Sequence, residues 1–127
     1  MKDGKMAQII LTFGLGKEKR RAVRSIAQKN KIQIKEISRK DYNQKLGALA
    51  GIQGFAKEKV IYNGPDFPLE MMVFSGIDSE QMDKFLADYK QLGTESVPLK
   101  AIVTPRNIFW TAEKLFHELW EEHLRFL

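Results

Sequence analysis

The 127-residue chain contains no cysteine, and this absence excludes several kinds of structure at once. A disulfide framework, a thiolate metal site and a cysteine nucleophile all require that side chain. Histidine is scarce as well, with only His117 and His123 present. No apolar run approaches the ~18 residues of a membrane span, and no apolar segment of signal-peptide length follows the early lysines. We therefore expect a cytoplasmic protein with no membrane partner.

What is present is ordinary for a globular protein. Hydrophobic residues make up 43% of the chain and charged residues 29%. A chain of this length is close to the usual size of one domain, and it can bury a core without a metal or a disulfide. Composition therefore predicts a single domain over residues 1–127.

The net charge of +5 conceals an uneven distribution. Residues 1–50 carry 13 Lys and Arg against 4 Asp and Glu, whereas residues 51–127 carry 8 against 12. Such a split can attract an anionic partner to the N-terminal half, or it can simply form a solvated basic face. Both interpretations stay open at this point.

Hydrophobic patterning alternates between strand and helix along the chain. Nearly continuous apolar runs predict buried strands, and one strictly alternating run predicts a strand with a wet face. The expected strands are 7–13, 31–35, 71–76 and 99–103, and the expected helices are 17–30, 41–51, 78–93 and 104–126. Residues 52–70 hold two glycines and two prolines and predict a long loop or irregular connection.

This βαβαβαβα order predicts a small three-layer α/β domain, with helices on both faces of a four-stranded, mostly parallel sheet. The two most apolar strands belong in the middle, which favours the strand order 2-1-3-4. We expect no internal repeat along the chain.

In such a sheet, ligands bind beyond the carboxyl ends of strands where the order reverses. The loops expected there contain Gly14, Gly16, Lys17, Ser75 and Gly76. Glycine lets the backbone approach a ligand, and a helix start next to a lysine suits a phosphate-sized anion. No complete phosphate-binding motif is present, so a plain tight turn with a solvent-facing lysine is the alternative.

No catalytic machinery can be assembled from the sequence. Ser75 is a nucleophile in principle, but no histidine lies near it in the chain. Glu113, His117 and Glu121 share one helix face, where they are more typical of a solvated surface than of a metal site. We assign no catalytic residue, no metal and no cofactor, and the sequence leans away from an enzyme.

The last predicted helix is more apolar than one sheet contact requires. Its bulkiest candidates for an interface are Phe109, Trp110, Phe116 and Trp120. Either the 52–70 connection covers this surplus within the chain, or a second copy or another protein does.

Nucleic acid is the remaining partner to consider. The basic first helix can grip phosphates, but no helix-turn-helix spacing, aromatic strand motif or zinc pattern accompanies it. Only non-specific, salt-sensitive binding is expected from such a helix, so nucleic acid is disfavoured.

Motifs in the C-terminal half resemble a known family. They are the strand around Phe74 and Ser75, the pattern Thr104-Pro105-x-Asn107-x-x-Trp110, and the ending from Glu118 to His123. Together they resemble a small bacterial family catalogued as a domain of unknown function, number 3783, over roughly residues 70–125. The resemblance implies a bacterial cytoplasmic protein and brings no activity, cofactor or catalytic residue.

Within the Thr104 pattern, we expect Thr104 to cap the last helix, Pro105 to occupy its first turn and Asn107 to bond to a neighbouring loop. The alternative is that Thr104 and Asn107 line the same crevice as Gly16 and Ser75. The leading hypothesis for the whole chain is a non-catalytic binding, regulatory or protein-interaction domain. A binder of a small anion, or an unrecognised enzyme, is the second, and non-specific nucleic-acid binding the third.

Overall fold

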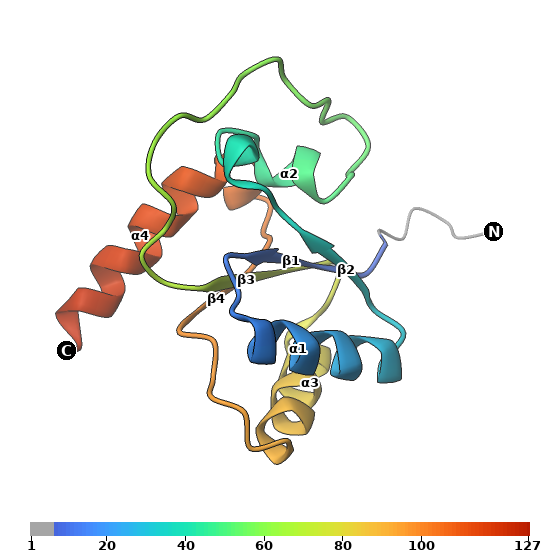
Figure 1. Cartoon of the computed structure of the whole chain (residues 1–127). Coiled ribbons are helices and arrows are strands. Elements are labelled where there is room, and N and C mark those ends of the chain that lie inside the picture. Colours follow the sequence, from blue (N-terminus) through green and yellow to red (C-terminus); the bar gives the residue numbers. More distant parts are fainter. Residues whose placement is uncertain (1–6) are drawn as a thin grey trace.

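A computed structural model of the chain describes residues 7–127. The expectation that no leader precedes the first strand falls on residues 1–6 and lies outside the described residues. The helices and strands follow the predicted order, with two short 3-10 turns added (Figure 1). The strands are β1 (Ile9–Phe13), β2 (Gln33–Glu36), β3 (Met71–Ser75) and β4 (Leu99–Ile102). The helices are α1 (Lys17–Lys29), α2 (Leu46–Leu49), α3 (Ser79–Gln91) and α4 (Ala112–Arg125), and the 3-10 turns are η1 (Arg39–Asp41) and η2 (Asn107–Phe109).

The four strands form one sheet in the order β2-β1-β3-β4, which confirms the predicted order. β1 pairs with β2 in parallel, and β3 pairs with β4 in parallel. The two central strands run antiparallel, with Leu11 opposite Val73 and Phe13 opposite Met71. The sheet is therefore mostly parallel, but its two halves point in opposite directions.

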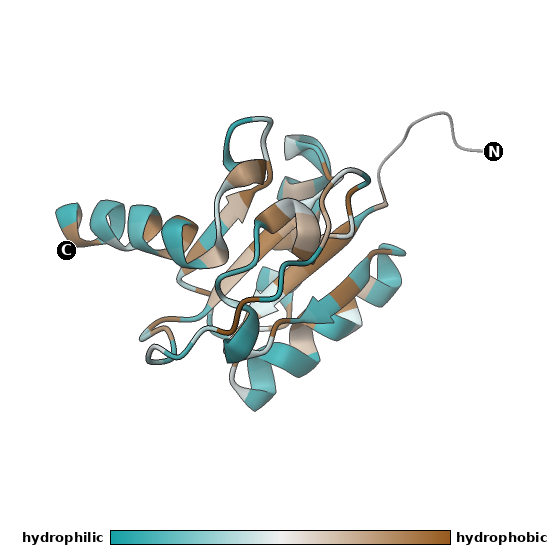
Figure 2. Ribbon diagram, turned by 90° about the horizontal axis from the view of Figure 1, so that it is seen from above, coloured by the Kyte–Doolittle hydropathy of each residue, from teal (hydrophilic) through white to brown (hydrophobic). Residues whose placement is uncertain are grey.

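Each face of the sheet supports its own hydrophobic layer. α1 and α3 cover one face, where Val23 and Phe85 pack with Ile10 and Phe74 of the central strands. α2, α4 and the connection between β2 and β3 cover the other face, where Leu46 joins the second core. Figure 1 shows these helices above and below the sheet, and Figure 2 shows the apolar strands between them. The predicted three-layer arrangement is confirmed.

The two halves of the sheet repeat one another, so the expectation of no internal repeat was wrong. β1 and β3 each have five residues, α1 and α3 each have 13, and corresponding positions are 62 residues apart. Gly14 and Gly76 correspond, and both have positive φ, at 69° and 71°. The register between β1 and β3 is centred on the corresponding residues Leu11 and Val73. Two β-α-β units are thus related by a local two-fold axis through the middle of the sheet.

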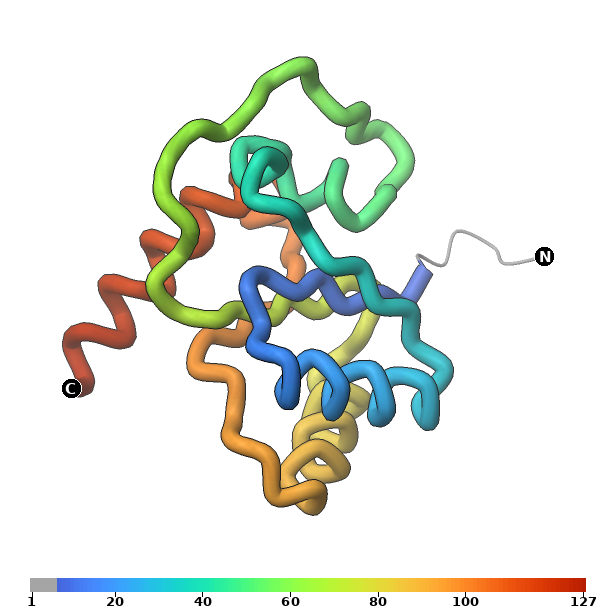
Figure 3. Tube along the Cα trace, viewed as in Figure 1, coloured from blue at the N-terminus to red at the C-terminus, as the bar shows by residue number. Residues whose placement is uncertain are grey.

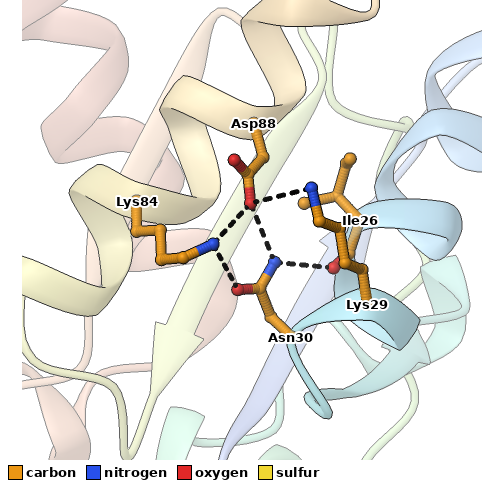
Figure 4. A network of polar contacts seen from close by, with 5 residues as sticks. All are labelled: Ile26, Lys29, Asn30, Lys84 and Asp88. Atoms are coloured by element: carbon orange, nitrogen blue, oxygen red, sulfur yellow. Dashed lines mark hydrogen bonds and ion pairs between the residues drawn. The ribbon is translucent and has the colours of Figure 1, made fainter.

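A polar cluster joins the two units where α1 ends beside α3 (Figure 4). The Asn30 side chain donates to the Ile26 carbonyl at 2.9 Å and accepts from Lys84. Asp88 accepts from Lys84 at 2.8 Å and from Asn30 at 3.4 Å. These hydrogen bonds lower the pKa of the Asp88 carboxyl, because they stabilise its charged form.

The connection over residues 52–70 contains no helix or strand, as predicted, and it arches over the α2–α4 face (Figure 3). Side chains fasten it along its length. Gln44 is buried and holds both the N–H and the carbonyl of Glu58 through its amide. Phe67 stacks between Tyr42 and Phe116, with ring centroids at 4.0 and 4.3 Å.

Two predicted helix starts were wrong. Asp41 does not cap a helix, because it lies in the 3-10 turn η1 and α2 begins after Lys45. The last helix begins at Ala112 with Thr111 as its N-cap, instead of at Thr104. α3, by contrast, starts where the sequence predicted, with Asp78 as its N-cap in a reciprocal pair with Gln81. No helix within residues 7–127 is long and apolar enough to cross a membrane.

Candidate functional site: the free edge of β4

The residues predicted to line one crevice lie at two opposite ends of the sheet. Phe13 is opposite Met71 and Ile9 is opposite Ser75, so the loop after β1 and the loop after β3 leave the sheet in opposite directions. Gly14, Gly16 and Lys17 are therefore separated from Ser75 and the loop that follows it. The prediction of a single crevice was wrong, because a crevice of that kind requires the two central strands to be parallel, and β1 and β3 are antiparallel.

At the first end, the chain supplies its own anion. The Glu70 carboxylate accepts from the Gly16 N–H at 2.6 Å and pairs with the Lys19 ammonium at 2.5 Å. This carboxylate stands at the start of α1, where the sequence predicted an external anion beside Lys17. Lys17 itself is exposed at the rim of a shallow pocket of about 410 Å³. Glu70 was missed because one acid in an irregular loop carries no pattern.

A smaller pocket of about 160 Å³ lies beside Gly14, beyond the ends of β1 and β2. Its polar groups are bonded within the chain. Tyr42 donates to the Asp66 carboxylate at 2.6 Å, and Arg39 donates to the Gly64 carbonyl at 2.9 Å. Burial and the Asp66 carboxylate raise the pKa of Tyr42 far above its usual range. The pocket is thus a stabilised corner of the fold.

The second end of the sheet is where the parallel strands β3 and β4 both finish. It holds the other four predicted residues, Ser75, Gly76, Thr104 and Asn107. Ser75 is 1% exposed, and its Oγ atom has no hydrogen-bond partner among the described residues. Gly76 has positive φ, in the turn that leads to α3. A hydroxyl buried this deeply is not accessible to a substrate.

Thr104 and Asn107 form a reciprocal turn. The Thr104 Oγ1 atom accepts from the Asn107 N–H at 3.0 Å and from the Arg106 N–H at 3.2 Å. The Asn107 side chain accepts from the Thr104 N–H at 2.8 Å and donates to the Ile102 carbonyl at 3.0 Å. The bond predicted from Asn107 to a neighbouring loop is instead made to its own turn and to the end of β4, so this side chain closes a turn and does not start α4.

Asn107 also caps the outer edge of β4. Leu99 and Val103 donate their N–H groups toward β3, to the carbonyls of Glu70 and Phe74, so the backbone groups of Lys100, Ile102 and Thr104 point away from the sheet. The Asn107 amide accepts from one of these outward groups and donates to another, as the backbone of a neighbouring strand would. Asn107 therefore closes the outer edge of the strand at the C-terminal end of β4.

The rest of this edge stays open. No strand formed by residues 7–127 pairs with the outer side of β4. The open backbone groups are the N–H and carbonyl of Lys100 and the N–H of Ile102. β2, the opposite edge strand, is mostly exposed and carries Lys35 and Glu36, which discourage pairing with another strand.

One pocket flanks β4 on each face. On the α3 face, a pocket of about 450 Å³ is mainly apolar and is lined in part by Lys100. Its wall residues are Met72, Leu86, Tyr89, Lys90, Thr94, Ser96 and Val97. On the α4 face, a pocket of about 260 Å³ lies between the start of β4 and the last turns of the helix. Lys100 borders both pockets.

The four apolar residues predicted as an interface on the last helix have different environments. Phe116 is 3% exposed and belongs to the core beneath Phe67. Trp110 and Trp120 are partly buried against the same core. Phe109 is 62% exposed and contacts Phe55. The 52–70 connection thus covers much of the surplus apolar surface, which was the intramolecular alternative.

The uncovered apolar surface lies at the other end of α4. Leu124, Phe126 and Leu127 are 47, 84 and 86% exposed. Figure 2 shows the last turns of α4 extending beyond the sheet. These residues were part of the apolar pattern of the helix, but bulk alone did not distinguish the covered end from the free end.

The structure places few groups that could perform chemistry. Within residues 7–127, no three His, Cys, Asp or Glu side chains are grouped closely enough to hold a metal ion. Glu113 and His117 approach one another at 3.9 Å on the surface of α4.

Residues 70–126 match a family model described as "Domain of unknown function (DUF3783)". The resemblance stated for the C-terminal half is confirmed. The matched segment contains β3, α3, β4 and α4, and therefore the open edge and both of its pockets. No curated protein and no solved structure matches the chain.

Proposed function

We propose that this protein is a non-catalytic interaction domain that binds an extended segment of another protein along the open edge of β4. The observation that carries the proposal is the set of outward backbone groups on Lys100 and Ile102, between one pocket on each face of the strand. In strand addition, backbone hydrogen bonds provide affinity, and alternate side chains enter pockets on the two faces. The edge of β4 offers both features.

The exposed end of α4 supports the same location. Phe126 and Leu127 border the pocket on the α4 face, together with Leu119. Exposed aromatic and aliphatic side chains next to a pocket are typical anchors of a protein interface. A bound segment would bury this apolar end of the helix as well as the strand edge.

A second copy of the chain fits this edge poorly. An antiparallel pair of β4 strands centred on Lys100 would place the two ammonium groups opposite one another, which is destabilising. A pair centred on Ala101 or Ile102 requires the Ile102 carbonyl, which Asn107 already holds. A register shifted toward Pro98 lacks an N–H donor there. A different partner avoids all three obstacles.

The test removes one backbone donor without breaking the sheet. Ile102→Pro deletes an outward N–H from β4, and proline is tolerated at such edge positions. Glu36→Pro is the matched control, because Glu36 holds the corresponding outward position on β2. The ligands are peptides selected on the full chain from a random ten-residue phage library, with affinity measured by fluorescence anisotropy.

We expect Ile102→Pro to weaken these peptides at least tenfold and Glu36→Pro to leave them unchanged, while both variants keep the parent's circular dichroism spectrum. Peptides that bind the two variants equally, or a library that yields no binder, would refute strand addition at β4.

A further inference from the structure

Comparison of the two repeated halves identifies one strand position that is apolar in the first half and charged in the second. The registers of β1–β2 and β3–β4 match, so Ile34 of β2 corresponds to Lys100 of β4. Ile34 packs against the core on the α1–α3 face, as the fold requires. At the corresponding place, the second half puts a lysine in the lining of a mainly apolar pocket.

The loop before β4 is also longer than its counterpart. Three residues join α1 to β2, whereas seven residues, 92–98, join α3 to β4. The longer loop supplies Thr94, Ser96 and Val97 to the pocket wall. Tyr89 fixes this loop, since its hydroxyl donates to the Glu95 carbonyl at 2.7 Å. The second half therefore builds a pocket where the first half closes its core.

The ammonium of Lys100 is only partly satisfied in this pocket. It donates to the Val97 carbonyl at 2.7 Å, and no acidic side chain among residues 7–127 borders the pocket. An ammonium group has three donors, so two remain for a ligand. Burial without a neighbouring carboxylate lowers the pKa of Lys100, because the charged form loses water and gains no counter-ion.

The pocket wall defines the group that would complete the site. Met72, Leu86 and Val97 provide apolar surface. A second amine, that of Lys90, borders the same pocket. The complement is an apolar side chain with a carboxylate beside it. On an extended segment, residues i and i+2 point to the same face and can supply both groups.

We infer that the partner segment presents an apolar side chain to the α3–β4 pocket and, two residues away, an Asp or Glu carboxylate to Lys100. This inference rests on the proposed function, since it assigns the sequence that the β4 edge selects. A bound strand could offer Lys100 either a side-chain carboxylate or its own C-terminal carboxylate. The inference commits to the side-chain carboxylate of a segment from another protein.

The experiment compares the selected peptides with two lysine variants. Lys100→Met keeps the length of the side chain and removes the charge. Lys35→Met is the matched control, because Lys35 also donates to a backbone carbonyl, that of Leu49, from the other edge strand. Each selected peptide is also prepared with its acid replaced by the amide, and with an amidated C-terminus.

We expect the selected peptides to share an apolar-x-acidic pattern, and Lys100→Met to weaken them at least tenfold. Lys35→Met should bind like the parent. Replacing the acid by its amide should weaken binding to the parent and leave binding to Lys100→Met unchanged.

The failures are distinguishable. Peptides that need the Ile102 N–H, but show no acid preference and ignore Lys100→Met, would overturn this inference and leave strand addition in place. Peptides that lose binding only when their C-terminus is amidated would also overturn it, because the carboxylate would then be terminal. If no peptide binds, or if Ile102→Pro has no effect, strand addition fails and this inference fails with it.

Discussion

The Asn107 side chain can be tested as the cap of the β4 edge. Asn107→Ala removes its bonds to the Thr104 N–H and the Ile102 carbonyl, at 2.8 and 3.0 Å. A hydrogen bond of this kind contributes about 0.5–1.5 kcal/mol, so the two together stabilise the fold by roughly 1–3 kcal/mol. With a urea m-value of about 1–3 kcal/mol/M, the midpoint of unfolding should fall by about 1 M.

The same substitution should change the oligomeric state. Once the Asn107 side chain is gone, the outward Ile102 carbonyl has lost its partner and the strand pair centred on Ala101 becomes available. That pair places Lys100 opposite Ile102 of the other copy, so it escapes like-charge opposition. We expect Asn107→Ala to self-associate more strongly than the parent in sedimentation velocity at high micromolar concentration.

Thr104→Ala is the control, because it removes two bonds from the same turn and leaves Asn107 on the edge. It should lower stability without promoting association. If Asn107→Ala loses less than about 0.5 kcal/mol, or if it sediments like Thr104→Ala, then Asn107 does not cap this edge.

Three further predictions concern single side chains. Glu70→Gln should lower the free energy of unfolding, measured by urea titration, by about 1–2 kcal/mol, because the charged bonds to Gly16 and Lys19 are lost. The control is Glu58→Gln, which breaks the exposed ion pair with Lys45 and should change the free energy of unfolding by less than about 0.5 kcal/mol. Lys100→Met should keep or raise the unfolding midpoint at pH 7, since folding lowers the pKa of that amine; a loss above about 1 kcal/mol would contradict this. Folding lowers the pKa of Asp88, so its contribution to stability is present above its ordinary pKa of 3.8 and is lost as pH falls through the lower folded value. Plots of the free energy of unfolding against pH for the parent and Asp88→Asn should therefore converge in acid. Plots that stay parallel down to about pH 2 would contradict the assignment.

The elements of the fold followed from local patterns. The continuous apolar runs at β1 and β3 predicted central strands, and both are buried throughout. The start of α3 was predicted correctly because a capping side chain and its target, here Asp78 and Gln81, lie three residues apart in the chain. Signals of this short range can be read without knowledge of the tertiary structure.

Strand direction could not be predicted from the same patterns. A buried strand has the same composition in parallel and antiparallel pairs, so the sequence of β3 did not indicate that it would pair with β1 in the antiparallel direction. The predicted crevice depended on that direction and failed with it. The repeat was also hidden, because it is carried by element lengths, Gly14 and Gly76, and backbone angles more than by residue identity.

The start of the last helix failed for a different reason. Thr-Pro followed by Asn suits a helix start and a tight turn equally well. Here the Asn107 side chain bonds backward to β4, and that contact selects the turn. The candidate site was only partly predicted: Thr104 and Asn107 border it, whereas Lys100 lies in the predicted strand 99–103 and was given no role.

The two-fold arrangement has a consequence for how the chain can be divided. Each β-α-β unit alone would be a two-stranded sheet with its most apolar strand, β1 or β3, along one side. All five residues of each of these strands are buried in the intact protein. A fragment containing one unit would expose a long hydrophobic edge, the kind of surface that causes aggregation. Each unit therefore covers the hydrophobic strand of the other. Proteolysis within the 52–70 connection should leave two fragments that remain together until both unfold.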